Sequence, residues 1–201
     1  MFSQRLQELV SSVHQCSYTL QTDPISEEKA FEISHDMISS TQTKQGVVYV
    51  IGNGGSAGIA SHFSNDLMKA LKIASQTLYD TNLMTCLAND IGYENVFSYP
   101  LDKYLKSNDL LVAISSSGQS ANIVKAAEVA LSRKASLLTL SGFKSTNPLR
   151  ALGHLNFWID ESDYGLVETA HFFLLHTIID LWKKHTAPVS HVQILETVRS
   201  R

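Results

Sequence analysis

From residue 46 onward, short apolar runs alternate with longer amphipathic stretches. The runs are "GVVYVI", "SQTLYD", "DLLVAI", "ASLLTL" and "LNFWID". Apolar residues recur at helical spacing between and after them, over about residues 56–72, 83–105, 120–133 and 166–184. Strands without polar alternation, divided by helices, are typical of a parallel sheet covered on both faces. The pattern therefore predicts an α/β fold.

The first 44 residues carry two further helical patterns. The first, over residues 2–22, has its apolar stripe at Phe2, Leu6, Leu9, Val10 and Val13. After Asp23-Pro24, Ser26 precedes Glu27 and Glu28, which indicates a second helix that runs to about Thr43. We divide the single domain, residues 1–201, into N-terminal helices (1–44), an α/β core (45–185) and a tail or short helix (186–201).

Composition excludes several classes of protein. The chain has 201 residues, a net charge of −3 and no long apolar run, so nucleic acid and a membrane are not expected as partners. The N-terminus lacks the apolar core of a signal peptide. Cys16 and Cys86 are not in a CxxC pair, which argues against a zinc ribbon or a disulfide framework and favours reduced thiols in the cytoplasm.

Two strands lead into similar loops of Gly and Ser, "VIGNGGSAG" and "AISSSGQSAN". Parallel sheets bind ligands beyond the carboxyl ends of their strands. In the second loop, Ser115, Ser116, Ser117 and Ser120 surround Gly118 and precede a helix. Hydroxyls and free amides at a helix start suit a phosphate monoester bound without Lys or Arg. The structural alternative is a Ser-rich turn in which Ser120 caps the helix.

The first loop has two interpretations. "GNGGSA" fits the GxGxxA form of the dinucleotide fingerprint, and Asp80 ends the next predicted strand, where a ribose-binding carboxylate would lie. A nucleotide oxidoreductase is therefore a competing hypothesis. It leaves the serine loop unexplained, and it also leaves unexplained the polar residues of two helices.

Those polar residues are histidines and carboxylates beside apolar stripes. His62 and Asp66 are four residues apart and face each other, so they could share a metal or a proton, or form one hydrogen bond. Glu168, His171 and His176 lie in an apolar helix. Glu168 and His176 are about 12 Å apart along that helix, so they reach one point only by leaning towards each other.

Four ordered motifs resemble the sugar isomerase (SIS) family, and most closely its phosphoheptose isomerases. They are "GNGGSAGIASHFSNDL", "LANDIGYEN", "ISSSGQSANIVKAA" and "VETAHFFLLHTIIDL". The resemblance spans about residues 2–184. It implies a flavodoxin-like parallel five-stranded sheet with helices on both faces, preceded by the N-terminal helix pair. It also implies a homotetramer with active sites between subunits.

The resemblance also implies roles for individual residues. The sugar would contact Asn53, Gly54, Gly55, Ser56, Asn89, Asp90 and Glu168, and the phosphate Ser115, Ser116, Ser117 and Ser120. Zinc or another divalent metal would be held by His62, Asp66, Glu168 and His176. Asp66 and His176 would be the acid/base pair, with His171 as support. Three positions depart from the family, since Asp66 replaces its catalytic glutamate, Glu168 replaces a glutamine, and Asn65 replaces a glutamate often found beside the catalytic one.

The activity implied is conversion of sedoheptulose 7-phosphate to D-glycero-D-manno-heptose 7-phosphate through a 1,2-enediol, for lipopolysaccharide or capsule. A non-catalytic alternative within the same fold is a phosphosugar-binding or regulatory protein of the type that binds a replication initiator. The metal content of the purified protein distinguishes the two, and NAD(P) titration tests the oxidoreductase hypothesis.

Overall fold

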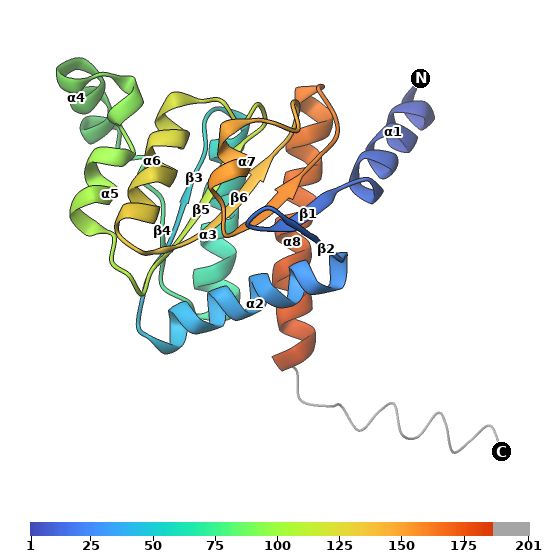
Figure 1. Ribbon diagram of the computed structural model, residues 1–201, viewed down its shortest axis with the longest axis horizontal. Helices are drawn as coiled ribbons and strands as arrows, with labels where there is room; N and C mark the ends of the chain where they lie inside the picture. The colour runs from blue at the N-terminus through green and yellow to red at the C-terminus, as the bar shows by residue number, and fades with distance from the viewer. Residues whose placement is uncertain (187–201) are drawn as a thin grey trace.

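The computed structural model describes residues 1–186. Its centre is a sheet of seven strands in the order β2-β1-β7-β6-β5-β3-β4 (Figure 1). The strands are β1 (Ser17–Leu20), β2 (Asp23–Ile25), β3 (Val48–Ile51), β4 (Ser75–Gln76), β5 (Leu110–Ser115), β6 (Ser136–Ser141) and β7 (Leu155–Trp158).

Five of these strands form the predicted parallel sheet. Strands β4, β3, β5, β6 and β7 are neighbours in that order and all pair in parallel. Numbered along the chain, they have the flavodoxin-like order 2-1-3-4-5. The strand count of five is nevertheless wrong for the whole sheet, because the β1–β2 hairpin adds two antiparallel strands beside β7.

The hairpin also corrects the prediction for the N-terminus. The first helix, α1 (Phe2–His14), ends eight residues before the predicted limit, and Ser17–Leu20 pairs with β7 instead. Gln21 turns the chain with a φ of 53° and donates its backbone N–H to His154 O over 2.7 Å. The hairpin separates α1 from α2 (Glu27–Thr43), so the N-terminal helix pair is not confirmed.

Helices cover both faces of the sheet, as predicted. Side chains of α2, α3 and α8 pack on one face against alternate strand residues such as Val50 and Val112. Helices α4 to α7 pack on the other face against Ile51 and Ala113 (Figure 1). The remaining bounds are α3 (Gly55–Leu71), α4 (Thr81–Ile91), the 3₁₀ helix η1 (Tyr93–Asn95), α5 (Ser98–Tyr104), α6 (Ala121–Ser132), α7 (Pro148–Leu152) and α8 (Tyr164–Thr186).

Local signals explain where several helices begin. Ser26 caps α2 by accepting the Lys29 N–H over 3.2 Å, as its position before Glu27 predicted.

The stretch 83–105 is three short helices instead of one, and α7 was not predicted. The prediction for residues 186–201 lies outside the described residues, apart from Thr186 at the end of α8. Among the described helices, none combines the length and apolar character needed to cross a bilayer.

Candidate active site

The two Gly/Ser loops lie side by side at the carboxyl edge of the sheet. Strands β3 and β5 are parallel neighbours, and the chain order reverses between them. Ligands of open α/β sheets bind at such a switch point. The structure therefore brings the loop after Ile51 and the loop after Ser115 to one place.

Glycine is required in both loops, either by the backbone conformation or by close neighbours. Gly54 has a φ of 53° with a ψ of −121°, which a side chain rarely tolerates. At Gly55 a Cβ atom would overlap the Glu168 carboxylate and lie 2.6 Å from its Cδ. At Gly118, whose φ is 63°, a Cβ atom would overlap the Asn147 side chain. The glycines thus let α8 and the loop before α7 approach the two strand ends.

A cavity of 250 Å³ lies between the loops. Its lining comprises Asn53, Gly54, Gly55, Ser56, Ile114, Ser115, Ser116, Ser117, Ser120, Tyr164 and Glu168. All eight polar or glycine positions of the two loops that line it are among the residues expected to contact sugar or phosphate, four from the serine pattern and four from the family resemblance. No Lys or Arg lines the cavity among the described residues. The predicted hydroxyl-rich pocket is therefore present as a space, with the Glu168 carboxylate in its lining.

Donors in the serine loop remain available to a ligand. The Ser116 hydroxyl is buried and makes no hydrogen bond to any described residue. Ser120 precedes α6, but its side chain makes no capping hydrogen bond and lies 3.3 Å from the Ser115 hydroxyl. The alternative of a Ser120-capped turn is therefore wrong. An unpartnered buried hydroxyl beside a free helix start is what an anion site offers.

An amide pair fixes the first loop beside α6. Asn53 and Asn122 exchange two hydrogen bonds of 2.9 Å, and the Tyr93 hydroxyl donates to Asn53 Oδ1 over 3.2 Å. Asn122 is buried, while Asn53 is partly exposed. Asn122, Tyr93 and Tyr164 were not singled out from the sequence, because nothing in their local pattern shows which residues will meet Asn53 or the serine loop.

His62, Asp66 and His176 form a second cluster. The His62 Nε2 atom lies 3.3 Å from Asp66 Oδ2, and the His176 Nδ1 atom lies 3.6 Å from the same oxygen. The two imidazole centroids are 4.8 Å apart. All three side chains reach the surface, with 48%, 26% and 39% of their side-chain area exposed. The structure thus unites the predicted acid/base pair with one further predicted ligand.

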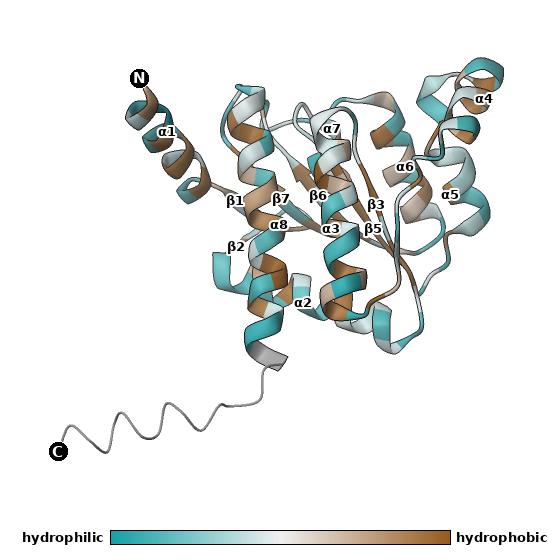
Figure 2. Cartoon of the chain, turned by 180° about the vertical axis from the view of Figure 1, so that it is seen from behind, coloured by the Kyte–Doolittle hydropathy of each residue, from teal (hydrophilic) through white to brown (hydrophobic). Residues whose placement is uncertain are grey.

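Glu168 is separate from this cluster. It lies at Gly55, beside the serine loop, whereas His176 is eight residues further along α8, about 12 Å along the helix axis. Helices α3 and α8 pack side by side and run in the same direction, from the cavity towards the cluster (Figure 2). Glu168 and His176 therefore lie apart, as their spacing on one helix indicated.

The three-residue cluster fits a divalent metal. One ligand atom from each of the three residues can be chosen so that all lie within 4.8 Å of one another. Two imidazole nitrogens and a carboxylate oxygen are a frequent donor set for catalytic zinc, which keeps a further position open. Three of the four predicted metal ligands therefore converge, and Glu168 does not join them.

His171 supports the site from inside the fold. It is fully buried, and because a carbonyl only accepts, its Nε2–H donates to Ser141 O over 3.1 Å. Its Nδ1 atom has no partner among the described residues. Burial lowers the pKa of His171 to about 4, against the opposing effect of the Ser141 hydrogen bond. His171 is thus a neutral link between α8 and the end of β6.

Three other predicted residues lie outside the cavity. Asn89 and Asp90 are exposed on α4, where the Asn89 amide donates to Asp90 Oδ1 and the Cys86 thiol to Asp90 Oδ2. Asp80 does not end a strand, because β4 ends at Gln76. Its carboxylate caps α4 by accepting the Leu83 N–H over 2.7 Å. A ribose-binding role for Asp80 is therefore not supported.

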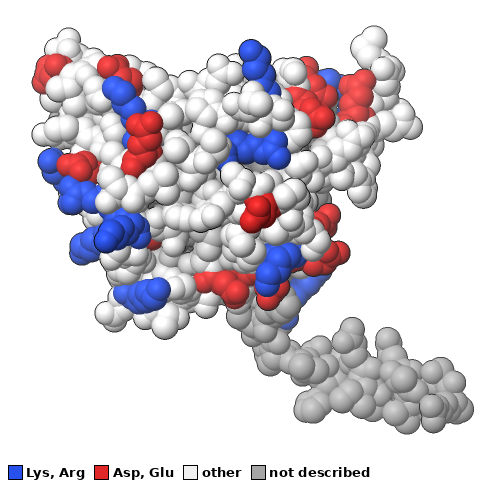
Figure 3. Space-filling view, viewed as in Figure 1, with Lys and Arg blue, Asp and Glu red and all other residues white. Residues whose placement is uncertain are grey.

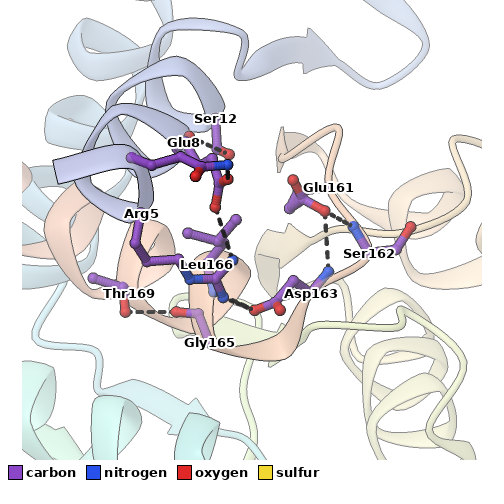
Figure 4. Close-up of polar contacts among 10 residues, drawn as sticks. Arg5, Glu8, Ser12, Glu161, Ser162, Asp163, Gly165, Leu166 and Thr169 are labelled. Carbon is purple, nitrogen blue, oxygen red and sulfur yellow. Dashed lines mark hydrogen bonds and ion pairs between the residues drawn. The ribbon is translucent and has the colours of Figure 1, made fainter. Parts of the chain in front are cut away.

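A helix cap fixes the start of α8, from which Tyr164 and Glu168 reach the cavity. Asp163 accepts the Leu166 N–H over 3.1 Å and pairs with Arg5 of α1 over 2.6 Å (Figure 4). The hydrogen bond from Leu166 and the Arg5 guanidinium both lower the pKa of Asp163. The first helix of the chain thus contacts the helix that carries the cavity's acid.

A sequence model described as "SIS domain" matches residues 15–142. The phosphoheptose isomerase of Campylobacter concisus (strain 13826) is 36% identical over 155 residues, which are 74% of this chain and 82% of that protein. The phosphoheptose isomerase of Helicobacter pylori (strain Shi470) is 31% identical over 157 residues, which are 75% and 81% of the two chains. This chain belongs to the SIS-domain family, in its phosphoheptose isomerase group.

Solved structures agree with this SIS-domain fold. Phosphoheptose isomerase GmhA from Neisseria gonorrhoeae superposes with a TM-score of 0.76 at 23% identity, covering 90% of this chain and 96% of that one. The Vibrio vulnificus NanR protein complexed with ManNAc-6P has a TM-score of 0.67 at 14% identity, covering 97% of this chain and 64% of that one. At these identities the likeness shows the fold alone.

Proposed function

We propose that this SIS-domain chain is a phosphosugar isomerase that converts sedoheptulose 7-phosphate to D-glycero-D-manno-heptose 7-phosphate. The observation that carries the proposal is the arrangement of two sites along α3 and α8. A hydroxyl-rich cavity without Lys or Arg in its lining lies at the start of both helices, and a His–Asp–His cluster lies further along them. Relatives that are 30–36% identical and cover most of the chain are named phosphoheptose isomerases.

The spacing of the two sites suits a seven-carbon substrate. From Gly55 to His62 is seven residues, or about 10 Å along the axis of α3. The path from C1 of a heptulose 7-phosphate to phosphorus has eight bonds, and an extended chain advances about 1.2 Å per bond, so it also spans about 10 Å. Phosphate in the serine loop would therefore place C1 and C2 near His62, Asp66 and His176.

The chemistry requires one proton to leave C1 and one to reach C2. A base removes the C1 proton of the open-chain ketose while the C2 carbonyl oxygen gains a proton, which gives the 1,2-enediol. Protonation at C2 and loss of the O1 proton then form the aldose. His176 and Asp66 are the proposed pair, since each keeps a second polar atom besides the one that faces its neighbour.

A metal at this cluster would be held by His62 Nε2, Asp66 Oδ2 and a nitrogen of His176. When bound, zinc or another divalent cation would polarise the sugar oxygens and stabilise negative charge on them. Glu168, placed beside the serine loop, would instead contact substrate hydroxyls. Because its carboxylate repels a phosphate dianion, we expect it to favour binding of the sugar chain over binding of phosphate alone.

The test is turnover of sedoheptulose 7-phosphate, followed by NMR of the products. His176→Gln and Asp66→Asn should each lower kcat by at least about 100-fold, in the range for loss of a general acid or base. Glu128→Gln, at an exposed position of α6, is the control. Unchanged turnover in His176→Gln would remove that residue from the mechanism. Metal analysis of the wild type and of His62→Gln tests the metal separately.

The non-catalytic alternative is not favoured, because the matched relatives carry the name of an enzyme. Four finer statements remain part of the proposal. They are assembly as a homotetramer with sites shared between subunits, use of residues 1–44 in that assembly, location in the cytoplasm, and service to lipopolysaccharide or capsule. Free thiols at Cys16 and Cys86 are consistent with a reducing compartment.

A further inference from the structure

A second polar cavity, of 360 Å³, lies between α7 and the turn that joins β1 to β2. Its lining comprises Thr19, Gln21, Thr22, Ser145, Thr146, Asn147, Arg150 and Ala151. Five lining residues have a hydroxyl or amide side chain that can donate a hydrogen bond to a ligand. They are Thr19, Gln21, Thr22, Ser145 and Thr146. No Asp or Glu lines this cavity among the described residues. Its composition is therefore opposite in charge to that of the first cavity, which contains Glu168.

Arg150 is the cation of this cavity, and the charge of Asp160 acts on it from beyond ion-pair distance. The described residues place no carboxylate within ion-pair distance of it, and its Nη1 donates only to Ser145 O over 3.2 Å. The guanidinium lies 4.5 Å above the Trp158 ring centroid. It is half-buried, and burial lowers the pKa of Arg150. A partly desolvated guanidinium with most of its donors free is stabilised by an oxyanion.

The surroundings supply neutral donors next to this cation. The Thr19 hydroxyl oxygen accepts from Asn156 Nδ2 over 3.2 Å, which leaves the Thr19 proton free to donate. Ser145 and Thr146 are exposed at the mouth of the cavity. In the space-filling view, a basic patch lies over the position of α7, in the middle of this face, with mostly uncharged surface around it (Figure 3). Nothing acidic in the lining competes for Arg150.

We propose that this cavity is a second anion site, which binds a phosphate group through Arg150, Thr19 and the hydroxyls of residues 145–146. The site differs from the serine loop in using a cation. The two sites share a wall. Asn147 lines the second cavity and touches Gly118 of the serine loop, and Leu149 N donates to Gly118 O over 3.1 Å. A test must therefore separate the two sites.

Inorganic phosphate is the probe, and Trp158 beneath Arg150 is the reporter. A Trp182→Phe background removes the other tryptophan. Phosphate is titrated against chloride at constant ionic strength, so that general screening is the same in both. We expect a saturable change in Trp158 fluorescence that persists in Ser117→Ala/Ser120→Ala, in which the serine loop is weakened.

Two variants test Arg150 directly. Arg150→Gln should weaken phosphate binding at this site by roughly 10- to 100-fold, the range for loss of a charge-assisted hydrogen bond. Thr22→Asp places a negative charge at an exposed lining position and should weaken binding about 10-fold even if Arg150→Gln fails to fold. Thr81→Asp, exposed on α4, is the matched control. The proposal would be overturned if Thr22→Asp bound phosphate as tightly as Thr81→Asp does. It would also be overturned if the fluorescence response disappeared in Ser117→Ala/Ser120→Ala.

Discussion

At the scale of single residues, Gly55 is the position where absence of a side chain matters most for the cavity. An added Cβ would overlap the end of Glu168, a flexible side chain that can move, so Gly55→Ala should displace the carboxylate and keep the fold. We expect the substrate KM to rise at least about 10-fold, as for loss of a hydrogen bond to a charged group. The measurement is steady-state kinetics with sedoheptulose 7-phosphate.

Gly58 provides the matched control on the same helix. An added Cβ there would meet nothing within 4 Å. Replacing an exposed helical glycine by alanine stabilises a protein by about 0.5–1 kcal/mol, so Gly58→Ala should raise the free energy of unfolding and leave KM unchanged. A KM for Gly55→Ala equal to that of Gly58→Ala would show that Glu168 does not contact the substrate.

His171 predicts a pH dependence of stability. Its pKa is about 4 in the folded protein and 6.5 in the reference state, so between these values the unfolded chain binds a proton that the folded chain does not. Stability therefore falls as the pH falls from about 6.5 to about 4, by about 3 kcal/mol from this residue. His171→Asn keeps a donor for Ser141 O and cannot titrate. Urea unfolding of both proteins at several pH values should give a shallower pH slope for the variant, and parallel slopes would contradict the assignment.

At the scale of elements, the start of α8 positions two residues of the cavity. Asp163 caps this helix and pairs with Arg5 (Figure 4). Asp163→Ala removes both interactions and should lower the Tm and raise the KM, because Tyr164 and Glu168 follow in the next two turns. Arg5→Ala leaves the cap and should lower the Tm less, since an exposed ion pair contributes little. Equal Tm values for the two variants would assign the effect to the ion pair alone.

The central elements could be predicted from the sequence because buried parallel strands leave a local trace. "DLLVAI" and "ASLLTL" are apolar throughout, since both faces of their strands are covered. The β1–β2 hairpin leaves no such trace. Ser17–Leu20 becomes a strand by pairing with β7, more than 130 residues later, and the helical spacing before it hides the boundary. Pairing with a strand that is distant in the sequence therefore determines the conformation of Ser17–Leu20.

Residues of the candidate site could likewise be predicted only where their partners are close in the sequence. The serine loop and the His62–Asp66 pair were predictable because their members are close in sequence. Helical spacing alone also indicated that Glu168 and His176 would lie apart. Asn122 and Tyr93 were missed, because their role depends on meeting Asn53 across 69 and 40 residues.

At the scale of the whole molecule, α1 and α8 leave an apolar surface exposed. Phe2, Leu6 and Val10 recur four residues apart on α1 and are 82%, 51% and 49% exposed, and Phe173 of α8 is 58% exposed. A cavity between the helices is lined by Leu9, Val10, Val13, His14, Glu27, Thr169 and Phe173. Contiguous exposed apolar surface of this kind marks an interaction site. We therefore expect this surface to lie between subunits if the proposed homotetramer forms.

Charge introduced into this surface should break the assembly and leave each subunit folded. Leu6→Glu/Val10→Glu puts two carboxylates where a second copy would bury apolar area, so light scattering should give a smaller assembly than for the wild type. Glu128→Lys/Lys134→Glu, at exposed positions on and just after α6, is a charged control that should not change the mass. If active sites are shared between subunits, turnover should fall together with the mass. A monomeric wild type, or full activity in a dissociated variant with unchanged circular dichroism, would contradict the shared site.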